Sequence, residues 1–283
     1  MYRVILGMVM LVIGVTVGCA GGGVLQPNQG MNAKSYDQGI QAFRDGRYDR
    51  ALRIFTDMIN ANPRLPELWN ARGFVFAELQ RWPEAILDFR KAVGLSSQNA
   101  QYQENLGIAY LESGSHSLAL ILFGQLLEHD PQTSRWWDHH GLALSRLGRY
   151  QEAIQDFSRA LKGEGSPANT YANRAVAYIK IGEKELAKRD LDQAIESDRG
   201  LAHAYESRGL LALSQGDFNL AVKDLSKALT LGANEALIHY NRGMALSMLG
   251  ETREAQSEWE IACGRQLLEA CIQAGGGNIP ERT

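Results

Sequence analysis

Small and large apolar residues recur along this chain at a fixed spacing of 34 residues. In repeats counted from residues 32, 66, 100, 134, 168, 202 and 236, position 8 is small, position 20 is alanine and position 24 is large and apolar. The position-8 residues are Gly39, Gly73, Gly107, Gly141, Ala175, Gly209 and Gly243, and the position-24 residues are Phe55, Phe89, Phe123, Phe157, Leu191, Leu225 and Trp259. Seven copies in register predict a repeat protein.

The residue types in these positions predict two helices in each repeat. Small residues at positions 8 and 20 allow two helices to approach closely, and the large residue at position 24 fills the space beside them. A glycine at position 15, replaced only by Gln80 in the second repeat, can adopt a positive φ and end the first helix. Only seven prolines occur, and no strand-like run follows the first twenty residues, so we expect an all-α fold.

The pattern resembles the tetratricopeptide repeat. That family carries W-x2-L-G-x2-Y, A-x3-F and a closing proline at matching places. The resemblance implies a right-handed α-solenoid of seven helix-turn-helix repeats over residues 33–269, with a C-terminal cap and tail at 270–283. The opening aromatics and closing prolines that match are Trp69, Trp137, Tyr171, Tyr205, Pro63 and Pro131.

Positions 7 and 23 vary together. A base at position 7 accompanies an acid at position 23 in five repeats, and both are missing from the first and third repeats. Pairing with the preceding repeat would instead place Leu106 against Asp88. With their acids matched, these bases are not expected to bind phosphate or carboxylate ligands. We therefore predict ion pairs within repeats, namely Arg72–Asp88, His140–Asp156, Arg174–Asp190, Arg208–Asp224 and Arg242–Glu258.

The family resemblance also implies a ligand groove. In this family the first helix of each repeat lines a concave face, and positions 5, 9 and 12 meet the ligand. Position 9 is apolar in every repeat here, and acids at position 5 rim it, which suits an amphipathic or partly basic peptide. The alternative is that position 9 only packs beneath the next repeat. The expected groove residues are Tyr36, Ile40, Phe43, Asn70, Phe74, Glu104, Ile108, Leu111, Asp138, Leu142, Val176, Leu210, Tyr240 and Met244.

No set of residues indicates catalysis. The net charge of −3 gives no basic excess for nucleic acid. His139 and His140 are adjacent and point about 100° apart on a helix, so they do not form an i, i+4 metal-binding pair. We expect no enzyme activity, no metal, no cofactor, no nucleic-acid partner and no small-molecule substrate.

Cys263 and Cys271 are either bridged or two buried thiols. On one continuous helix they would lie about 12 Å apart, beyond the roughly 7 Å that bridged Cα atoms allow. A bridge therefore requires the chain to fold back, which Gly264 would permit. Residues 265–274 would then form a short helix over the last apolar face, with Leu267, Leu268, Cys271 and Ile272 on one side. In an oxidising compartment the disulfide is the favoured prediction.

The N-terminus predicts export. Arg3 precedes an apolar run that is too short for a membrane-spanning helix of about 20 residues. The run ends in a stretch that resembles a bacterial lipobox, with Gly18 before the cut and Cys19 after it, although Thr16 is unusual there. We interpret residues 1–18 as a lipoprotein signal peptide, Cys19 as the lipidation site and residues 19–32 as a flexible linker. A plain secreted protein and an uncut anchor remain alternatives.

These features predict a scaffold or adaptor of the bacterial cell envelope, held to the membrane by its N-terminal lipid. Ala20, where an aspartate would suggest inner-membrane retention, favours the outer membrane facing the periplasm. The expected partners are peptide or helical segments of other envelope proteins. The chain looks like repeat lipoproteins that act as adaptors for cell-wall enzymes, or as pilotins for secretins of type IV pili. A rigid spacer within an envelope complex and a chaperone for exported polypeptides are the alternatives.

Overall fold

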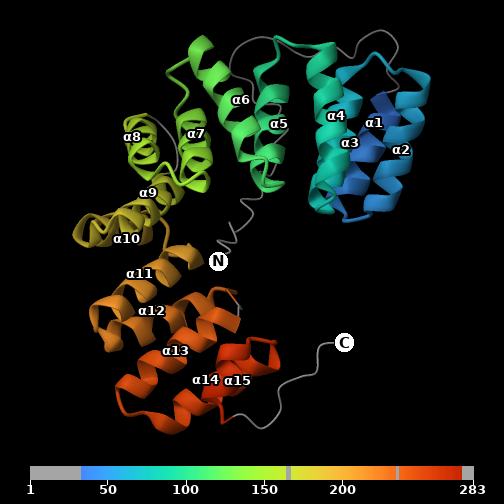
Figure 1. Ribbon diagram of the computed structural model, residues 1–283. Coiled ribbons are helices and arrows are strands. Elements are labelled where there is room, and N and C mark those ends of the chain that lie inside the picture. Colours follow the sequence, from blue (N-terminus) through green and yellow to red (C-terminus); the bar gives the residue numbers. More distant parts are fainter. Residues whose placement is uncertain (1–32, 164–166, 234–235, 276–283) are drawn as a thin grey trace. The chain divides into compact units, whose positions relative to one another are not determined.

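The computed structural model describes residues 33–163, 167–233 and 236–275, which fold into fifteen α-helices in two compact halves (Figure 1). The N-terminal half contains α1 (Ala33–Arg44), α2 (Tyr48–Ala61), α3 (Pro66–Glu78), α4 (Trp82–Leu95), α5 (Ala100–Glu112), α6 (His116–His129), α7 (Ser134–Arg146) and α8 (Tyr150–Ala160). The C-terminal half contains α9 (Pro167–Ile181), α10 (Lys184–Ser197), α11 (Ala202–Gln215), α12 (Phe218–Thr230), α13 (Ala236–Met248), α14 (Thr252–Gly264) and α15 (Leu268–Gln273).

Within each half, every helix packs against the next one along the chain, so that the helix pairs stack in sequence order. The described residues contain no strand, and the predicted all-α solenoid of repeats is confirmed. None of the helices in the described ranges is long and apolar enough to cross a membrane. The signal peptide, Cys19 and linker that the sequence predicts lie outside the described residues, as does the tail from residue 276.

The small residue at position 8 allows close contact between the helices of a pair. A Cβ atom added to Gly107 of α5 would lie 2.7 Å from the ring of Phe123 on α6, closer than real carbon contacts. The Phe123 side chain is fully buried, and the same contact recurs between Gly39 and Phe55. Because the ring occupies the space of a missing methyl group, positions 8 and 24 determine each other's size.

The left-handed turn between paired helices does not require glycine. Six position-15 glycines have positive φ values, and Gln80 adopts the same conformation with φ 55°. In this turn the Arg81 N–H donates to the Phe76 carbonyl (2.9 Å), as the Arg47 N–H does to Ala42 (2.8 Å). The hydrogen bonds of the helix end are therefore kept, while the side chain adds steric strain.

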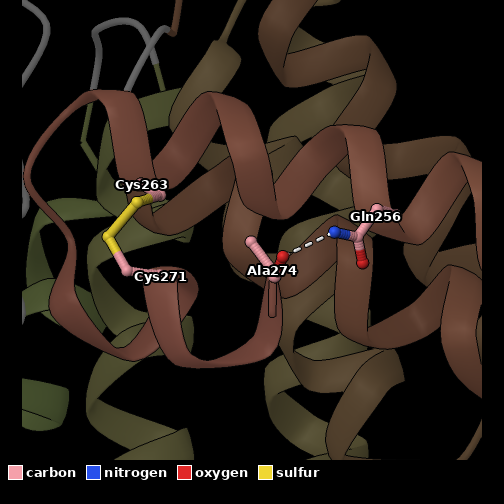
Figure 2. Close-up of a disulfide and its surroundings, with 4 residues drawn as sticks. All are labelled: Gln256, Cys263, Cys271 and Ala274. Carbon is pink, nitrogen blue, oxygen red and sulfur yellow. Dashed lines mark hydrogen bonds between the residues drawn. A yellow bond between two sulfur atoms is a disulfide. The ribbon is translucent and has the colours of Figure 1, made fainter. Parts of the chain in front are cut away.

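The C-terminal cap is α15, which a Cys263–Cys271 disulfide joins to α14, and the Gln256 amide donates to the Ala274 carbonyl (2.7 Å; Figure 2). The predicted hinge at Gly264 is wrong, because Gly264 is the last residue of α14 and the chain reverses at Gln266, with φ 68°.

The cap helix is shorter than predicted, and its apolar residues do not share one side. Cys271 is 3% exposed, whereas Leu268 and Ile272 are 49% and 63% exposed. Six residues make fewer than two turns, so only one narrow stripe of the helix can pack against α14.

Candidate protein-binding site

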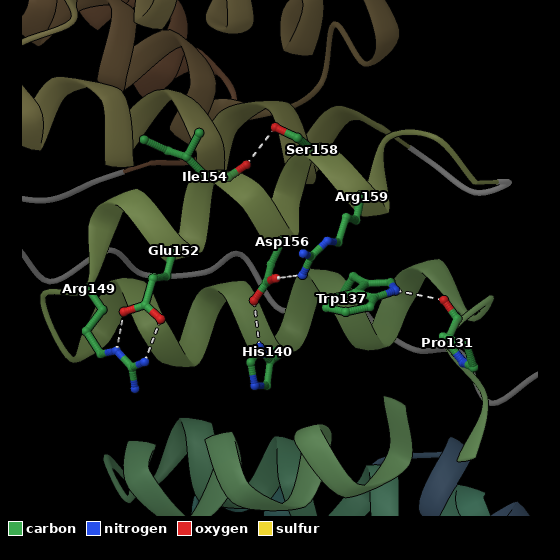
Figure 3. Close-up of polar contacts among 9 residues, drawn as sticks. All are labelled: Pro131, Trp137, His140, Arg149, Glu152, Ile154, Asp156, Ser158 and Arg159. Carbon is green, nitrogen blue, oxygen red and sulfur yellow. Dashed lines mark hydrogen bonds and ion pairs between the residues drawn. The ribbon is translucent and has the colours of Figure 1, made fainter. Parts of the chain in front are cut away.

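The structure contains each of the five ion pairs proposed from positions 7 and 23. Arg72, Arg174 and Arg208 each place Nε 2.7 Å from the aspartate of the same repeat. His140 Nδ1 lies 2.6 Å from Asp156, as Figure 3 shows, and Arg242 pairs with Glu258. The five acids are only 1% to 5% exposed, so the bases compensate for their lost hydration, with Arg159 as a second partner of Asp156 (3.0 Å) and His239 as a second partner of Glu258 (2.8 Å).

Position-7 arginines also reach the preceding repeat, which the sequence reasoning did not anticipate. Arg72 donates through Nη1 to the Thr56 hydroxyl (3.1 Å), and Arg208 donates to Asp192 (2.7 Å). Each of these guanidinium groups thereby ties its own helix pair to the second helix of the repeat before it. Their donors are used inside the fold, which fits a structural role better than ligand binding.

The residue at position 9 is half-buried in six of the seven repeats. These residues are Ile40, Phe74, Ile108, Val176, Leu210 and Met244. At positions 5 and 12, Tyr36, Phe43, Asn70, Asp138 and Tyr240 are half-buried as well. We call the half-buried residues of these two sets the first-helix face. Each half of the molecule carries its own part of it.

Three predicted groove residues are not accessible. Leu111 and Leu142 are 7% and 8% exposed, and Glu104 is only 4% exposed. The expected acidic rim is therefore wrong at Glu104. Its carboxylate accepts hydrogen bonds from Arg135 Nε (2.8 Å) and from the buried indole of Trp136 (3.0 Å). Both donors come from the next repeat, so the family pattern within one repeat gave no sign of them.

The charge of Glu67 on α3 also acts on tyrosines of the two neighbouring repeats, Tyr36 of α1 and Tyr102 of α5. Burial, and then the Glu67 and Tyr36 charges, raise the pKa of Tyr102 to about 12, and burial with Glu67 raises the pKa of Tyr36. Glu67 Oε2 is buried and accepts no hydrogen bond from the described residues.

An amide pair lies beside these groups. Asn105 of α5 donates to the side-chain oxygen of Asn70 on α3 (2.8 Å), and Gln101 donates to Asn105 (3.1 Å). Asn70 is thus partly satisfied from within the fold. The N-terminal part of the first-helix face therefore combines half-buried apolar residues with one carboxylate whose hydrogen bonding is incomplete.

In the C-terminal part of the face, the half-buried Glu206 stands at position 5 of the sixth repeat. Ala172 at position 5 is buried, and burial lowers the pKa of His203 on α11. His239 Nδ1 lies 2.8 Å from Glu258 Oε2, so this histidine joins the Arg242–Glu258 pair rather than facing a ligand. Across the described ranges, no group of three or more His, Cys, Asp or Glu side chains is placed to hold a metal ion.

Comparisons with known proteins agree with this architecture. A tetratricopeptide repeat protein from Parabacteroides merdae has a similar fold, with TM-score 0.69, 20% identity, and coverage of 86% of this chain and 96% of that one. Pseudomonas aeruginosa pilF matches with TM-score 0.64 and 14% identity, over 75% of this chain and 95% of its own. At these identities the likeness concerns the fold alone.

Among curated proteins, the Drosophila melanogaster BBSome complex member BBS4 homolog is 37% identical over 71 residues, which is 25% of this chain. This chain spans only 15% to 17% of the length of the first curated relatives that it matches. The model of the tetratricopeptide repeat matches residues 36–100, 104–169 and 173–236, more than half of the chain. The chain therefore belongs to the tetratricopeptide repeat family, and its repeats form a scaffold for protein–protein interactions.

Proposed function

We propose that this protein is a lipid-anchored scaffold of the bacterial cell envelope, which binds segments of partner proteins on the part of the first-helix face that each half carries. The observation that carries the binding site is the half-burial of position 9 in six repeats. Side chains that only packed beneath the next repeat would be as buried as Leu142, which is 8% exposed. The other six position-9 side chains keep apolar surface that a ligand would remove from water.

The polar groups of the N-terminal half support a basic residue in the bound segment. Glu67 Oε2 is buried without a hydrogen-bond donor, which costs about 1–3 kcal/mol for a neutral group and more for a charged one. The Glu67 residue as a whole is half-buried, so its carboxylate charge would attract a lysine or arginine side chain of the partner. The neighbouring Tyr36 and Tyr102 phenols would flank it. The expected ligand is thus an amphipathic peptide or helix with a basic residue.

The envelope location rests on the N-terminal sequence. The apolar run, the lipobox-like Gly18-Cys19 and the Gly-rich residues that follow support export, lipidation at Cys19 and a flexible tether. Several acyl chains on one cysteine would hold the protein firmly to the membrane, whereas one chain would not. Replacing Cys19 by serine should move the protein from the membrane fraction to the soluble fraction, and unchanged fractionation would refute the anchor.

The binding face can be tested by photo-crosslinking. A photo-crosslinking residue at Ile108, on the first-helix face, is compared with one at Ile121, which lies on the second helix α6 and is 59% exposed. The partner is first identified by affinity purification from membranes and mass spectrometry. We expect its cross-link from position 108 and none from position 121. A cross-link from position 121 alone would refute groove binding and favour a spacer that binds through its second helices.

A further inference from the structure

The C-terminal half contains a cavity of about 520 Å³ that uses none of the predicted groove residues. It lies where α10, α11 and α12 meet, and its lining includes Ile195, Tyr205 and Arg208 from α10 and α11 and Lys223 and Lys227 from α12. We call this cavity the α12 notch. All of its lining residues belong to one half, so its shape does not depend on how the two halves are placed.

The charges that line the α12 notch are mostly positive. Lys223 and Lys227 are exposed, lie one helical turn apart, and take part in none of the ion pairs found among the described residues. Arg208 is the third cation, and it already binds Asp224 (2.7 Å) and Asp192 (2.7 Å). The only carboxylate in the lining, Asp224, shares the single charge of Arg208 with Asp192, and the two lysines leave this group of side chains with a net positive charge that attracts an anion.

The second and fourth repeats carry a larger side chain at the corresponding place. Trp69 and Trp137 stand at position 4, where the sixth repeat has Tyr205, and their indoles donate to the carbonyls of Pro63 (2.9 Å) and Pro131 (2.8 Å). In those repeats the cation at position 26 lies over the indole: Lys91 Nζ is 5.9 Å from the Trp69 ring, and the Arg159 guanidinium is 4.5 Å from the Trp137 ring (Figure 3).

The sixth repeat differs in two ways that leave the notch open and charged. Its position-4 residue, Tyr205, has a shorter side chain than tryptophan, and the loop before it reads Asp198-Arg199-Gly200 with no proline. It is also the only repeat in the sequence with a base at both position 22 and position 26, since the second repeat has Leu87 and the fourth has Gln155 at position 22.

We propose that the α12 notch binds a carboxylate side chain from an acidic segment of a partner protein. An ionised carboxylate only accepts hydrogen bonds, and the two lysine ammonium groups only donate them. Ile195 and the Tyr205 ring offer apolar surface to the methylene groups of a glutamate. The α12 notch is separate from the first-helix face, so the proposal for the notch does not depend on whether a partner binds to that face.

The test uses the full chain and a fluorescein-labelled hexaglutamate peptide, with binding followed by fluorescence anisotropy at low ionic strength. The double variant Lys223→Gln, Lys227→Gln should weaken binding about tenfold, because two exposed charge pairs with the peptide are lost. The control is Lys184→Gln, Lys188→Gln on α10, which has the same spacing and exposure outside the notch. It should change binding by less than about twofold.

A second variant separates shape from charge. Tyr205→Trp places the larger side chain of the second and fourth repeats in the α12 notch and should weaken peptide binding without altering any charge. Absent binding, equal losses from the two lysine pairs, or wild-type affinity in Tyr205→Trp would each overturn the proposal. Displacement of the peptide by inorganic phosphate at lower concentration than by free glutamate would overturn it in favour of a phosphate site.

Discussion

Removing the Asp88 carboxylate should destabilise the N-terminal half more than removing the whole Arg72–Asp88 pair. Asp88 is 4% exposed and accepts two hydrogen bonds from Arg72, at 2.7 Å and 2.9 Å. In Asp88→Ala the guanidinium keeps only the Thr56 hydroxyl (3.1 Å) and the faces of Trp69 and Phe76, 5.2 Å and 5.7 Å away. The arginine is then left largely buried with no counter-charge.

The magnitude follows from this partial compensation. Breaking a buried ion pair by removing one partner costs about 3–5 kcal/mol. The Arg72 side chain is 17% exposed, and its hydroxyl and aromatic neighbours stay in place, so we expect about 2–3 kcal/mol for Asp88→Ala. The double variant Arg72→Leu, Asp88→Leu removes both charges and should lie within about 1 kcal/mol of the wild type.

The chain supplies its own precedent for the double variant. The third repeat has Leu106 and Leu122 at the same two positions, and Leu106 is buried in the core formed with Phe89. Leucines at positions 7 and 23 are therefore compatible with the helix pair of a repeat. The double variant reproduces a side-chain combination that the fold already accommodates, so its comparison with Asp88→Ala isolates the uncompensated arginine.

The assay is urea unfolding followed by circular dichroism, with the midpoints of the three proteins compared at one pH. Midpoints are used because repeat arrays do not always unfold in two states. Asp88→Ala should unfold at the lowest urea concentration. Equal midpoints for Asp88→Ala and the double variant would refute the reasoning that the unpaired buried charge, rather than the lost bond, determines the cost.

Four further variants test the packing, the turn and the tyrosine environment. Gly107→Ala should lower the free energy of unfolding by about 1–3 kcal/mol, because its methyl group would meet the Phe123 ring at 2.7 Å, whereas Gly94→Ala, which meets nothing within 4 Å in α4, should raise it by about 0.5–1 kcal/mol. Urea unfolding measures both, and a loss at Gly94 would contradict the packing argument. Gln80→Gly should raise the melting temperature, because it relieves a side chain held at φ 55°. Tyr102 has a folded-state pKa of about 12 against an ordinary value of 10.0, so its contribution to stability is fully present below pH 10 and is lost as pH rises through 12. Tyr102→Phe should flatten the fall in stability over that range, and an unchanged slope between pH 10 and 12 would contradict it.

The contacts within a repeat were predictable because the repeat encodes them directly. Gly107 and Phe123, like Arg72 and Asp88, are separated by 16 residues, and that separation is the same in every copy. A charge present or missing at position 7 is therefore matched at position 23. Comparing the copies within one chain was enough to identify which residues face each other across the helix pair.

Contacts between repeats were harder to predict. The Glu104 carboxylate accepts from Arg135 and Trp136, at separations of 31 and 32 residues, and no other repeat has these residue types together. A single occurrence leaves no pattern across copies. The turn at Gln266 was not predicted because no glycine marks it. Hydrogen bonds at the helix end hold Gln266 in the left-handed conformation without one.

The sequence by itself determined the helix pairs, their seven-fold repetition and the family. It also indicated which residues of each pair lie against one another, because the 34-residue spacing repeats the same local geometry. Only the tertiary structure decided which first-helix residues stay accessible, that Glu104 is sealed by its neighbours, and that the sixth repeat leaves an open cationic notch. These features depend on the size of the side chains that adjacent repeats bring together. The residue pattern within a single repeat does not specify how neighbouring repeats pack against each other.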